Sequence, residues 1–365
     1  MTTTTHPPVR WDAGIGAFVV TGFDEASAVL RSTGWSSDPA NSPLAPPGTS
    51  ELPTGLMLFR DPPDHTRLRR LVSSAFTARR VQALRPAVEA MVGELLDGLA
   101  GEADFVPAFA FPLPVNVIGE LLGVPAADRA QFQTLIGDWS RVLEVLSPEV
   151  LAKADPAAAT LRAYLAGLAA ERRRKPADDL LSALVAAESD GDRLTEDELL
   201  TMAALLFAAG FETTTNLLSN SLVALLSDPS QHPSLHADPA TAVEELLRYD
   251  TSVQIVVRVV YEDIELGGVP VSAGERVVAY LGAGNRDPER FADPHRLDLG
   301  RSDNAPLSFG GGIHYCLGAP LARLEAQVAL PALLRRFPGL ALAGSPVRRD
   351  SLTIRGYTAL PVRAQ

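Results

Sequence analysis

Apolar residues recur every three or four positions along most long segments of this chain, which is the spacing of amphipathic helices. Short runs of β-branched residues, typical of strands, occur around Val19 and between Val253 and Leu281. The pattern predicts a single, mainly α domain over residues 1–365 with small β-sheets. The segments predicted to be helical are 66–75, 80–99, 158–173, 195–227, 240–249 and 319–336.

The longest predicted helix occupies the middle of the chain. Thr195 and Glu198 form the S/T-x-x-E pattern of a capping box, and Asp228 followed by Pro229 ends the helix. About 32 residues lie between these signals, a length of about 50 Å at about 1.5 Å per residue. Because positions 202–226 are apolar almost all round, we expect this helix to run through the core.

The centre of that helix reads AAGFETTTN and departs from ordinary helix composition. Gly210 and the threonines are poor helix formers, and the charge of Glu212 is costly to bury. A solvated stripe would explain these residues, but the segments LLFAA before them and LLSNSLVALL after them argue against one. Local rules broken in the middle of a core more often mark a functional site.

The chain has one cysteine, Cys316, in the stretch FGGGIHYCLGAPLARLEAQ. An unpaired cysteine is usually a small apolar filler of the core. This one comes just before a predicted helix, whose free N–H groups and dipole favour a thiolate. Gly310, Gly311 and Gly312 let the backbone approach something large and flat without intervening side chains. The stretch therefore predicts a site that holds a thiolate against a bound group.

Several chemistries that use a thiolate or a glycine loop fit this stretch poorly. GGGIHY lacks the glycine spacing and the preceding strand of a nucleotide-binding loop. Zinc needs more cysteines or clustered histidines than the chain offers. His314 lies too close to Cys316 in sequence for the geometry of a cysteine hydrolase. Axial ligation of a haem iron remains.

The composition narrows the setting of this chemistry. A single cysteine excludes an internal disulfide and fits a reducing cytoplasm. The N-terminal residues lack the basic and apolar regions of a signal peptide, and no run of about 18 apolar residues suggests a membrane span. The formal net charge of −12 argues against general affinity for nucleic acid. We therefore expect a cytoplasmic protein without a membrane span.

Five motifs, in order along the chain, resemble those of the cytochromes P450, the haem-thiolate monooxygenases. The pattern Phe309-x-x-Gly312-x-x-x-Cys316-x-Gly318 is similar to the haem-ligand signature of that family. DPPDHTRLRRLVSSAFT resembles its propionate-binding helix, and AGFETT resembles its oxygen-activating segment. EELLR and ADPHRLD resemble the two parts of its structural network. The resemblance extends from about Phe18 to the end of the chain.

This resemblance implies a P450 fold in which the long central helix crosses over a haem b whose axial ligand is the thiolate of Cys316. Glu212 is then the acid and Thr213 the alcohol in oxygen activation, and Gly210 lets the helix open locally. The residues implied to bind the cofactor are His65, Arg69, Ala209, Gly210, Arg258, Phe309, Gly310, His314, Cys316 and Gly318. Of these, His65, Arg69, Arg258 and His314 are implied to contact the haem propionates.

The resemblance also implies a buried structural network of Glu245, Arg248 and Arg296. Glu245 and Arg248 are three residues apart, on one face of a helix. An exposed pair of this kind would contribute only about 0.3–0.5 kcal/mol. Two departures from the family pattern are expected to matter. The chain begins close to the first strand, so the N-terminal part is expected to be shortened, and Pro331 is expected to kink the helix after Cys316.

The reaction implied is insertion of one oxygen atom from dioxygen into a hydrophobic small molecule, in secondary metabolism. Residues expected to line the substrate pocket are Leu205, Ala208, Ala209, Ile255 and Val256, although ordinary core packing explains Leu205 equally well. Oxidative coupling, peroxide-driven oxidation and a non-enzymatic haem sensor are the alternatives. The acid and alcohol at Glu212 and Thr213 count against the last two.

Electrons for such a reaction are expected to come from other proteins. One cysteine cannot hold an iron–sulfur cluster, which needs about four, and no glycine-rich nucleotide fingerprint follows a strand. By resemblance the donors are a small acidic ferredoxin and its ferredoxin reductase. The docking face is expected on the thiolate side of the haem, among Arg67, Arg70, Arg79, Arg80 and Arg323.

Overall fold

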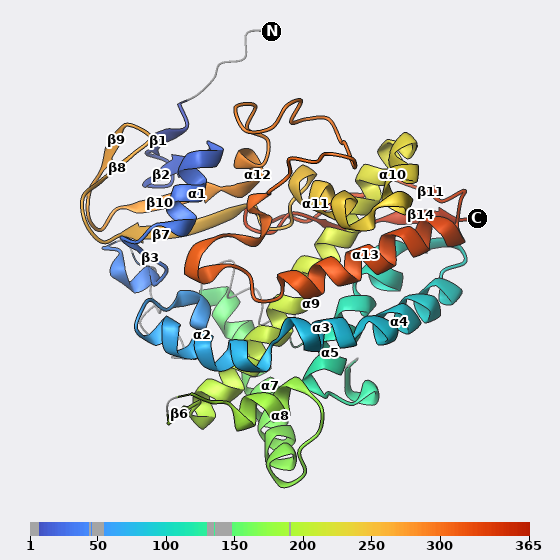
Figure 1. Ribbon diagram of the computed structural model, residues 1–365, viewed down its shortest axis with the longest axis horizontal. Coiled ribbons are helices and arrows are strands. Elements are labelled where there is room, and N and C mark those ends of the chain that lie inside the picture. The colour runs from blue at the N-terminus through green and yellow to red at the C-terminus, as the bar shows by residue number, and fades with distance from the viewer. Residues whose placement is uncertain (1–6, 44, 46–54, 130–134, 136–147, 190) are drawn as a thin grey trace.

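Helices form most of the structure (Figure 1). The computed structural model describes residues 7–43, 45, 55–129, 135, 148–189 and 191–365. Its helices are α1 (Phe23–Arg31), α2 (Asp64–Ala75), α3 (Ala78–Ala83), α4 (Arg85–Gly98), α5 (Pro112–Leu122), α7 (Pro148–Arg174), α8 (Leu180–Ala186), α9 (Glu196–Ser227), α10 (His232–Ala237), α11 (Pro239–Tyr249), α12 (Leu281–Gly284) and α13 (Ala319–Arg336). None of these described helices is long and apolar enough to cross a membrane.

The main sheet lies to one side of the helices (Figure 1). Its strands follow the order β1 (Val9–Asp12), β2 (Ala17–Val20), β10 (Arg276–Tyr280), β7 (Ile255–Val260) and β3 (Trp35–Ser36). Only the β2–β10 pair among them is parallel. The strand predicted near Val19 and the β-rich region predicted from Val253 to Leu281 are both confirmed.

The remaining strands form small sheets at the edges of the fold. β11 (Ala341–Leu342), β14 (Pro361–Ala364) and β4 (Gly101–Asp104) make a three-stranded sheet. Three hairpin-like pairs are β5 (Glu188–Ser189) with β6 (Asp192–Arg193), β8 (Ile264–Leu266) with β9 (Val269–Val271), and β12 (Val347–Arg348) with β13 (Tyr357–Ala359). The predicted class, mainly α with small β-sheets, is therefore confirmed.

Helix α9 confirms the predicted long central helix. It has 32 residues, and Thr195 and Glu198 make both hydrogen bonds of the capping box. Most of its side chains are buried, and α5, α7, α11 and α13 pack around it. The helix is α-helical through Gly210, and the local opening that oxygen would require there stays a prediction. A Cβ on Gly210 would lie 3.1 Å from Cγ1 of Ile118, so glycine at this position lets α5 approach α9 closely.

Two other predicted helices differ from the structure, and each has a proline at or inside it. The segment 80–99 forms two helices, because Pro86 has no N–H with which to extend α3 and instead occupies the first turn of α4. Helix α7 begins at Pro148, earlier than predicted, and continues through Pro156. Helix α13 has the predicted bounds and continues through Pro331, where the kink stays a prediction.

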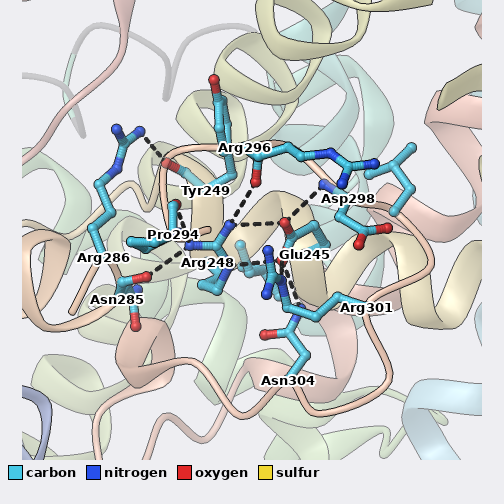
Figure 2. Close-up of polar contacts among 12 residues, drawn as sticks. Glu245, Arg248, Tyr249, Asn285, Arg286, Pro294, Arg296, Asp298, Arg301 and Asn304 are labelled. Atoms are coloured by element: carbon cyan, nitrogen blue, oxygen red, sulfur yellow. Dashed lines mark hydrogen bonds and ion pairs between the residues drawn. The ribbon is translucent and has the colours of Figure 1, made fainter. Parts of the chain in front are cut away.

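A buried ion pair joins helix α11 to the irregular segment that follows α12 (Figure 2). Glu245 and Arg248 have no exposed surface, and their side chains meet at 2.7 and 2.8 Å. The other N–H groups of Arg248 donate to the carbonyls of Asn285 and Pro294, both at 2.8 Å, and of Arg296 at 3.2 Å. All five guanidinium N–H groups therefore have partners.

The third charged side chain of this network is Arg301, and not Arg296 as predicted. Arg301 Nε donates to Glu245 Oε2 at 3.1 Å, and Asn304 Nδ2 donates to the same oxygen at 3.0 Å. The Arg296 side chain is exposed, and this residue takes part through its carbonyl only (Figure 2). The irregular segment has no periodicity, so the sequence does not indicate which of its arginines turns inward.

The network also positions the residues that precede Cys316. The side chain of Asn285, whose carbonyl accepts from Arg248, donates to Ser308 Oγ at 2.9 Å. Its Oδ1 accepts the N–H of Leu307 at 2.7 Å, and Ser308 Oγ donates to the Leu247 carbonyl at 2.8 Å. A continuous set of buried hydrogen bonds therefore runs from α11 to the start of the stretch that contains the cysteine.

Replacing Arg301 by alanine is expected to lower the free energy of unfolding by about 1.5–3 kcal/mol, because buried Glu245 loses a charged donor. The Arg296→Ala variant keeps its carbonyl and is the matched control, with an expected change below about 0.5 kcal/mol. Urea unfolding of both variants and the parent protein measures the difference. Equal losses in the two variants would contradict the assignment of the third position to Arg301.

Candidate active site

The cysteine loop, defined as residues 309–318, leads into helix α13 and packs against the end of α1. Gly310 and Gly312 have φ angles of 69° and 61°, a region that favours glycine. A Cβ on Gly312 would lie 2.5 Å from the carbonyl oxygen of Leu30, so this glycine allows the contact with α1. A Cβ on Gly310 would have no neighbour closer than 4.0 Å. Gly310 therefore leaves space open beside the cysteine, where it borders a cavity.

Cys316 faces that internal cavity. Its N–H donates to the carbonyl of Phe309 at 2.9 Å, which closes the loop. Burial raises the pKa of the thiol, while the N–H groups of Gly318 and Ala319 and the charge of Arg69 act in the opposite direction. The N–H groups at the start of α13 therefore lower the pKa of the Cys316 thiol, as predicted, but burial raises this pKa by more. A bound cation would complete the stabilisation.

Most of the predicted site residues line one cavity of about 330 Å³ between α2, α9, β7 and the cysteine loop. The predicted residues on its wall are His65, Arg69, Leu205, Ala209, Gly210, Thr213, Val256, Arg258, Phe309, Gly310, His314, Cys316 and Gly318. They come from segments that are far apart in the sequence. The cavity is therefore the place where the separate motifs meet.

Three predicted residues lie outside the cavity wall. Ala208 is buried on another face of α9, because the helix turns positions 205, 209 and 213 toward the cavity. Ile255 precedes Val256 on β7, and successive side chains of a strand point to opposite faces. The predictions that Ala208 and Ile255 line the pocket are therefore wrong. Glu212 is the third of these residues.

The carboxylate of Glu212 forms an ion pair with Arg349 at 2.7 Å. The two side chains are 14% and 25% exposed, so the pair lies near the surface, behind the cavity wall. The neighbouring Thr213 does reach the wall, and its hydroxyl donates to the carbonyl of Ala209 at 3.0 Å. The Ser252 hydroxyl donates to the Thr213 carbonyl at 2.9 Å. The acid and the alcohol therefore point in different directions from adjacent positions of α9.

A cluster of two histidines and two arginines occupies one end of the cavity. His65 and Arg69 lie one turn apart on α2, Arg258 lies on β7 and His314 lies in the cysteine loop. The rings of the two histidines are 4.2 Å apart between centroids. Both ring nitrogens of His65 and Nε2 of His314 are buried and have no hydrogen-bond partner in the described structure. Both histidines belong to the cavity wall.

The electrostatics of this cluster favour the binding of an anion. Burial, followed by the neighbouring positive groups, lowers the pKa of His65 and lowers that of His314 to about 3. Burial also lowers the pKa of Arg69, and that of Arg258 to about 10. Positive charge is thus disfavoured at all four positions as long as they face one another alone. A bound dianion would remove this penalty.

Thr251 and Glu325 are among the polar residues of the cavity that are absent from the sequence-based predictions. Thr251 has a buried hydroxyl oxygen with no partner among the described residues. Glu325 of α13 is 1% exposed, and burial raises the pKa of its carboxyl well above the usual value, which favours the neutral form. A signal for Glu325 exists, because it lies among the inward-facing apolar residues of α13, next to Leu324. Thr251 lies in a loop and has no such signal.

The chain is similar in sequence to one known protein family and to characterised proteins of that family. Residues 9–242 and 240–350 match the profile of the family described as Cytochrome P450. The cytochrome P450 monooxygenase PikC of Streptomyces venezuelae is 45% identical over 367 residues, which cover 97% of this chain and 87% of PikC. The 6-deoxyerythronolide B hydroxylase of Saccharopolyspora erythraea is 44% identical over 379 residues, which cover 98% of this chain and 92% of that protein.

The fold is also shared with solved structures. P450BioI, in a crystal structure with an acyl carrier protein ligated to hexadec-9Z-enoic acid, superposes with a TM-score of 0.91 at 37% identity. That match covers 98% of this chain and 94% of P450BioI, and it confirms the predicted P450 fold. The chain belongs to the cytochrome P450 family and is a haem-dependent monooxygenase.

Proposed function

We propose that this enzyme inserts one oxygen atom into a hydrophobic secondary metabolite, at the cavity bounded by Cys316, the histidine–arginine cluster and Thr213. The observation that supports this most directly is that all three parts border the same internal space. A thiol, an anion-binding cluster and a helix alcohol would have no reason to converge in an ordinary core. A cytoplasmic location remains a prediction from the sequence.

The residues around the cavity fit haem b. We propose that the thiol of Cys316 ligates the iron and that the ring nitrogens of His65 and His314, which lack partners among the described residues, donate to carboxylates. Arg69 and Arg258 add the positive charge that two propionates require. The backbone of Gly310 leaves open space beside the thiol. Bound haem supplies the iron-centred redox chemistry that activates dioxygen.

We assign different tasks to the two oxygen-activating residues. Thr213 presents its hydroxyl at the cavity wall, where we propose that its O–H turns from the Ala209 carbonyl to donate a hydrogen bond to a bound group. Glu212 lies on the solvent side of the same helix turn, held by Arg349 at 2.7 Å. We propose that Glu212 takes up protons from solvent and that Thr213 delivers them to the cavity. Water is excluded from the cavity by the apolar side chains around it.

The substrate is proposed to be a large, hydrophobic molecule. Leu205, Val256 and Ile118 give the cavity an apolar wall, and the unpartnered hydroxyl of Thr251 offers one polar contact. One relative is named for 6-deoxyerythronolide B, and P450BioI was solved with an acyl carrier protein ligated to hexadec-9Z-enoic acid. Macrolactones and long-chain acyl compounds are therefore the first candidates.

The electron donor is proposed to be an acidic ferredoxin with its reductase. Three of the five arginines expected to form the docking face are paired inside the chain. Arg67 bonds Glu198, Arg80 contacts Asp178 at 3.4 Å, and Arg323 bonds Glu244. Arg79 has an exposed side chain, and the cysteine loop exposes Ile313 and Tyr315. We therefore propose that the docking face includes Arg79 and the exposed part of the cysteine loop.

The assignment of the ligand predicts a spectroscopic result. Carbon monoxide added to the reduced parent enzyme is expected to give the red-shifted Soret band of thiolate-ligated haem. Cys316→Ala is expected to abolish that band while circular dichroism shows unchanged helicity. The unchanged helicity separates loss of the ligand from unfolding. A normal band in Cys316→Ala would overturn the assignment of Cys316.

Glu212→Gln and Thr213→Ala are each expected to divert electrons from product to hydrogen peroxide, because proton delivery to the cavity fails. A decrease of about 10²-fold in product per electron is expected from loss of a proton-transfer group. The substrate for the assay is chosen from a panel of 6-deoxyerythronolide B, a steroid and a C16 fatty acid, by the largest Soret shift on binding. NADPH, peroxide and product are measured together. Unchanged yields in both variants would show that the pair has no part in oxygen activation.

The docking proposal predicts a dependence on salt. Turnover supported by ferredoxin is expected to fall as ionic strength rises and to fall further in Arg79→Glu, because steering of an acidic partner is screened or reversed. Lys153→Glu changes an exposed cation on α7 by the same amount and serves as the control. Peroxide-supported turnover needs no partner and is expected to be unaffected. Equal responses of the two activities would exclude this face as the docking site.

A further inference from the structure

Asp61 does not line the cavity, but its charge acts on the histidine–arginine cluster at the cavity wall. Donors from two other segments of the chain hold its carboxylate in place. Ser36 Oγ donates to Oδ2 at 2.5 Å, and the N–H of Ser37 donates to Oδ1 at 2.8 Å. The Tyr261 hydroxyl, at the end of β7, donates to Oδ2 at 2.6 Å. Asp61 itself comes just before helix α2, so its side chain joins three parts of the fold.

The backbone of Asp61 also fixes the start of α2. Its carbonyl accepts the N–H of His65 at 2.9 Å, in the first turn of the helix. His65 and Arg69 follow on the face of that helix that borders the cavity. Asp61, whose carboxylate accepts the three hydrogen bonds, therefore also fixes the start of the helix that carries His65 and Arg69.

The charge of Asp61 acts on the cluster from outside the cavity. It favours the cationic forms of His65, His314 and Arg258, opposing the effect of burial on each. Although burial would raise the pKa of Asp61, the hydrogen bonds from Ser36, Tyr261 and Ser37 outweigh it and lower that pKa. Asp61 is therefore held as a carboxylate at neutral pH.

We infer that Asp61 is a positioning residue that sets a fixed negative charge beside the propionate end of the haem site and thereby lowers the reduction potential of the iron. This inference rests on the proposed placement of the propionates at His65, Arg69, Arg258 and His314. A fixed anion near the iron stabilises the ferric state over the ferrous state, because reduction adds negative charge. The bonds from Ser36, Ser37 and Tyr261 keep that anion from turning toward solvent.

The test is the reduction potential of the substrate-free holoenzyme, measured by spectroelectrochemical titration. Asp61→Asn keeps the size of the side chain and an oxygen that can accept hydrogen bonds, but removes the charge. Its reduction equilibrium constant is expected to shift toward the ferrous state by about three- to tenfold, tenfold being 59 mV for a one-electron couple. Asp61→Glu keeps the charge and is expected to stay close to the parent value.

Two matched controls separate the effect of the Asp61 charge on the potential from the effect of losing one of its hydrogen bonds. Asp64→Asn removes the same charge from an exposed side chain of the same segment, and a smaller shift is expected because solvent screens it. Tyr261→Phe removes one hydrogen bond and no charge, and the potential is expected to remain near that of the parent. If Asp61→Asn shifts the potential no further than Asp64→Asn, or no further than Tyr261→Phe, the inference is wrong. Asp61→Ser is a second charge-removing variant should the asparagine variant not fold.

Failure of the propionate assignment would have a different signature. His65→Ala and Arg69→Ala are expected to lose haem faster than the parent to an acceptor such as apomyoglobin. Asp61→Asn is expected to retain the carbon monoxide band of thiolate ligation. If the His65 and Arg69 variants hold haem as tightly as the parent, the cluster does not bind the propionates. If they lose haem but Asp61→Asn leaves the potential unchanged, only the role of Asp61 is refuted.

Discussion

The need to satisfy one buried ion pair organises the side of the molecule that presents the cysteine. A charged pair with no exposed surface is costly unless every donor and acceptor finds a partner. Arg248 uses all five of its N–H groups, and the carboxylate of Glu245 accepts from Arg248, Asp298, Arg301 and Asn304. Most of these partners belong to one irregular segment, 285–304. The hydrogen bonds that satisfy Glu245 and Arg248 therefore fix the backbone of segment 285–304, which has no regular secondary structure.

Helix α9 shows how polar residues can be placed in the middle of an apolar helix. The side chains of Thr213, Thr214, Asn216 and Ser219 each donate to a carbonyl four residues earlier in the same helix. Such bonds satisfy these four side chains locally, so that they need no partner outside the helix. The charge of Glu212 has Arg349 as its partner at 2.7 Å, and Asn220 donates to the carbonyls of Asp250 and Arg355 outside the helix. The unusual composition of this turn therefore does not interrupt the helix.

The sequence predicts well whatever depends on one continuous pattern. Helix α9, its capping box and the strand at Val19 follow from periodicity and capping residues that are local, and the cysteine loop from a short motif. A local sequence pattern cannot show which other part of the fold packs against a given face of a helix or strand. Ala208 and Ile255 have the right residue type but point away from the cavity, and Glu212 turns toward Arg349, which is 137 positions later in the chain.

Loop residues are the least predictable part of the site. Arg301, and not Arg296, reaches Glu245, although both arginines lie in the same aperiodic segment. Thr251 joins the cavity from another loop. In such segments the direction of a side chain depends on tertiary contacts, and no repeat in the sequence encodes it. Glu325 is different, because its charge interrupts the apolar face of α13 and could have been noticed.

The cavity wall draws on residues from Leu30 in α1 to Glu325 in α13, and this spread has a consequence for how the protein matures. The pocket cannot close until nearly the whole chain has been synthesised, since its thiol and one of its histidines come from the last sixth. Contacts between such distant segments form late, because a long stretch of chain must first be ordered. With the propionates placed as proposed, haem enters a nearly finished fold and neutralises the cluster of His65, Arg69, Arg258 and His314. Cells short of haem would accumulate a cofactor-free chain that lacks the stability that binding adds.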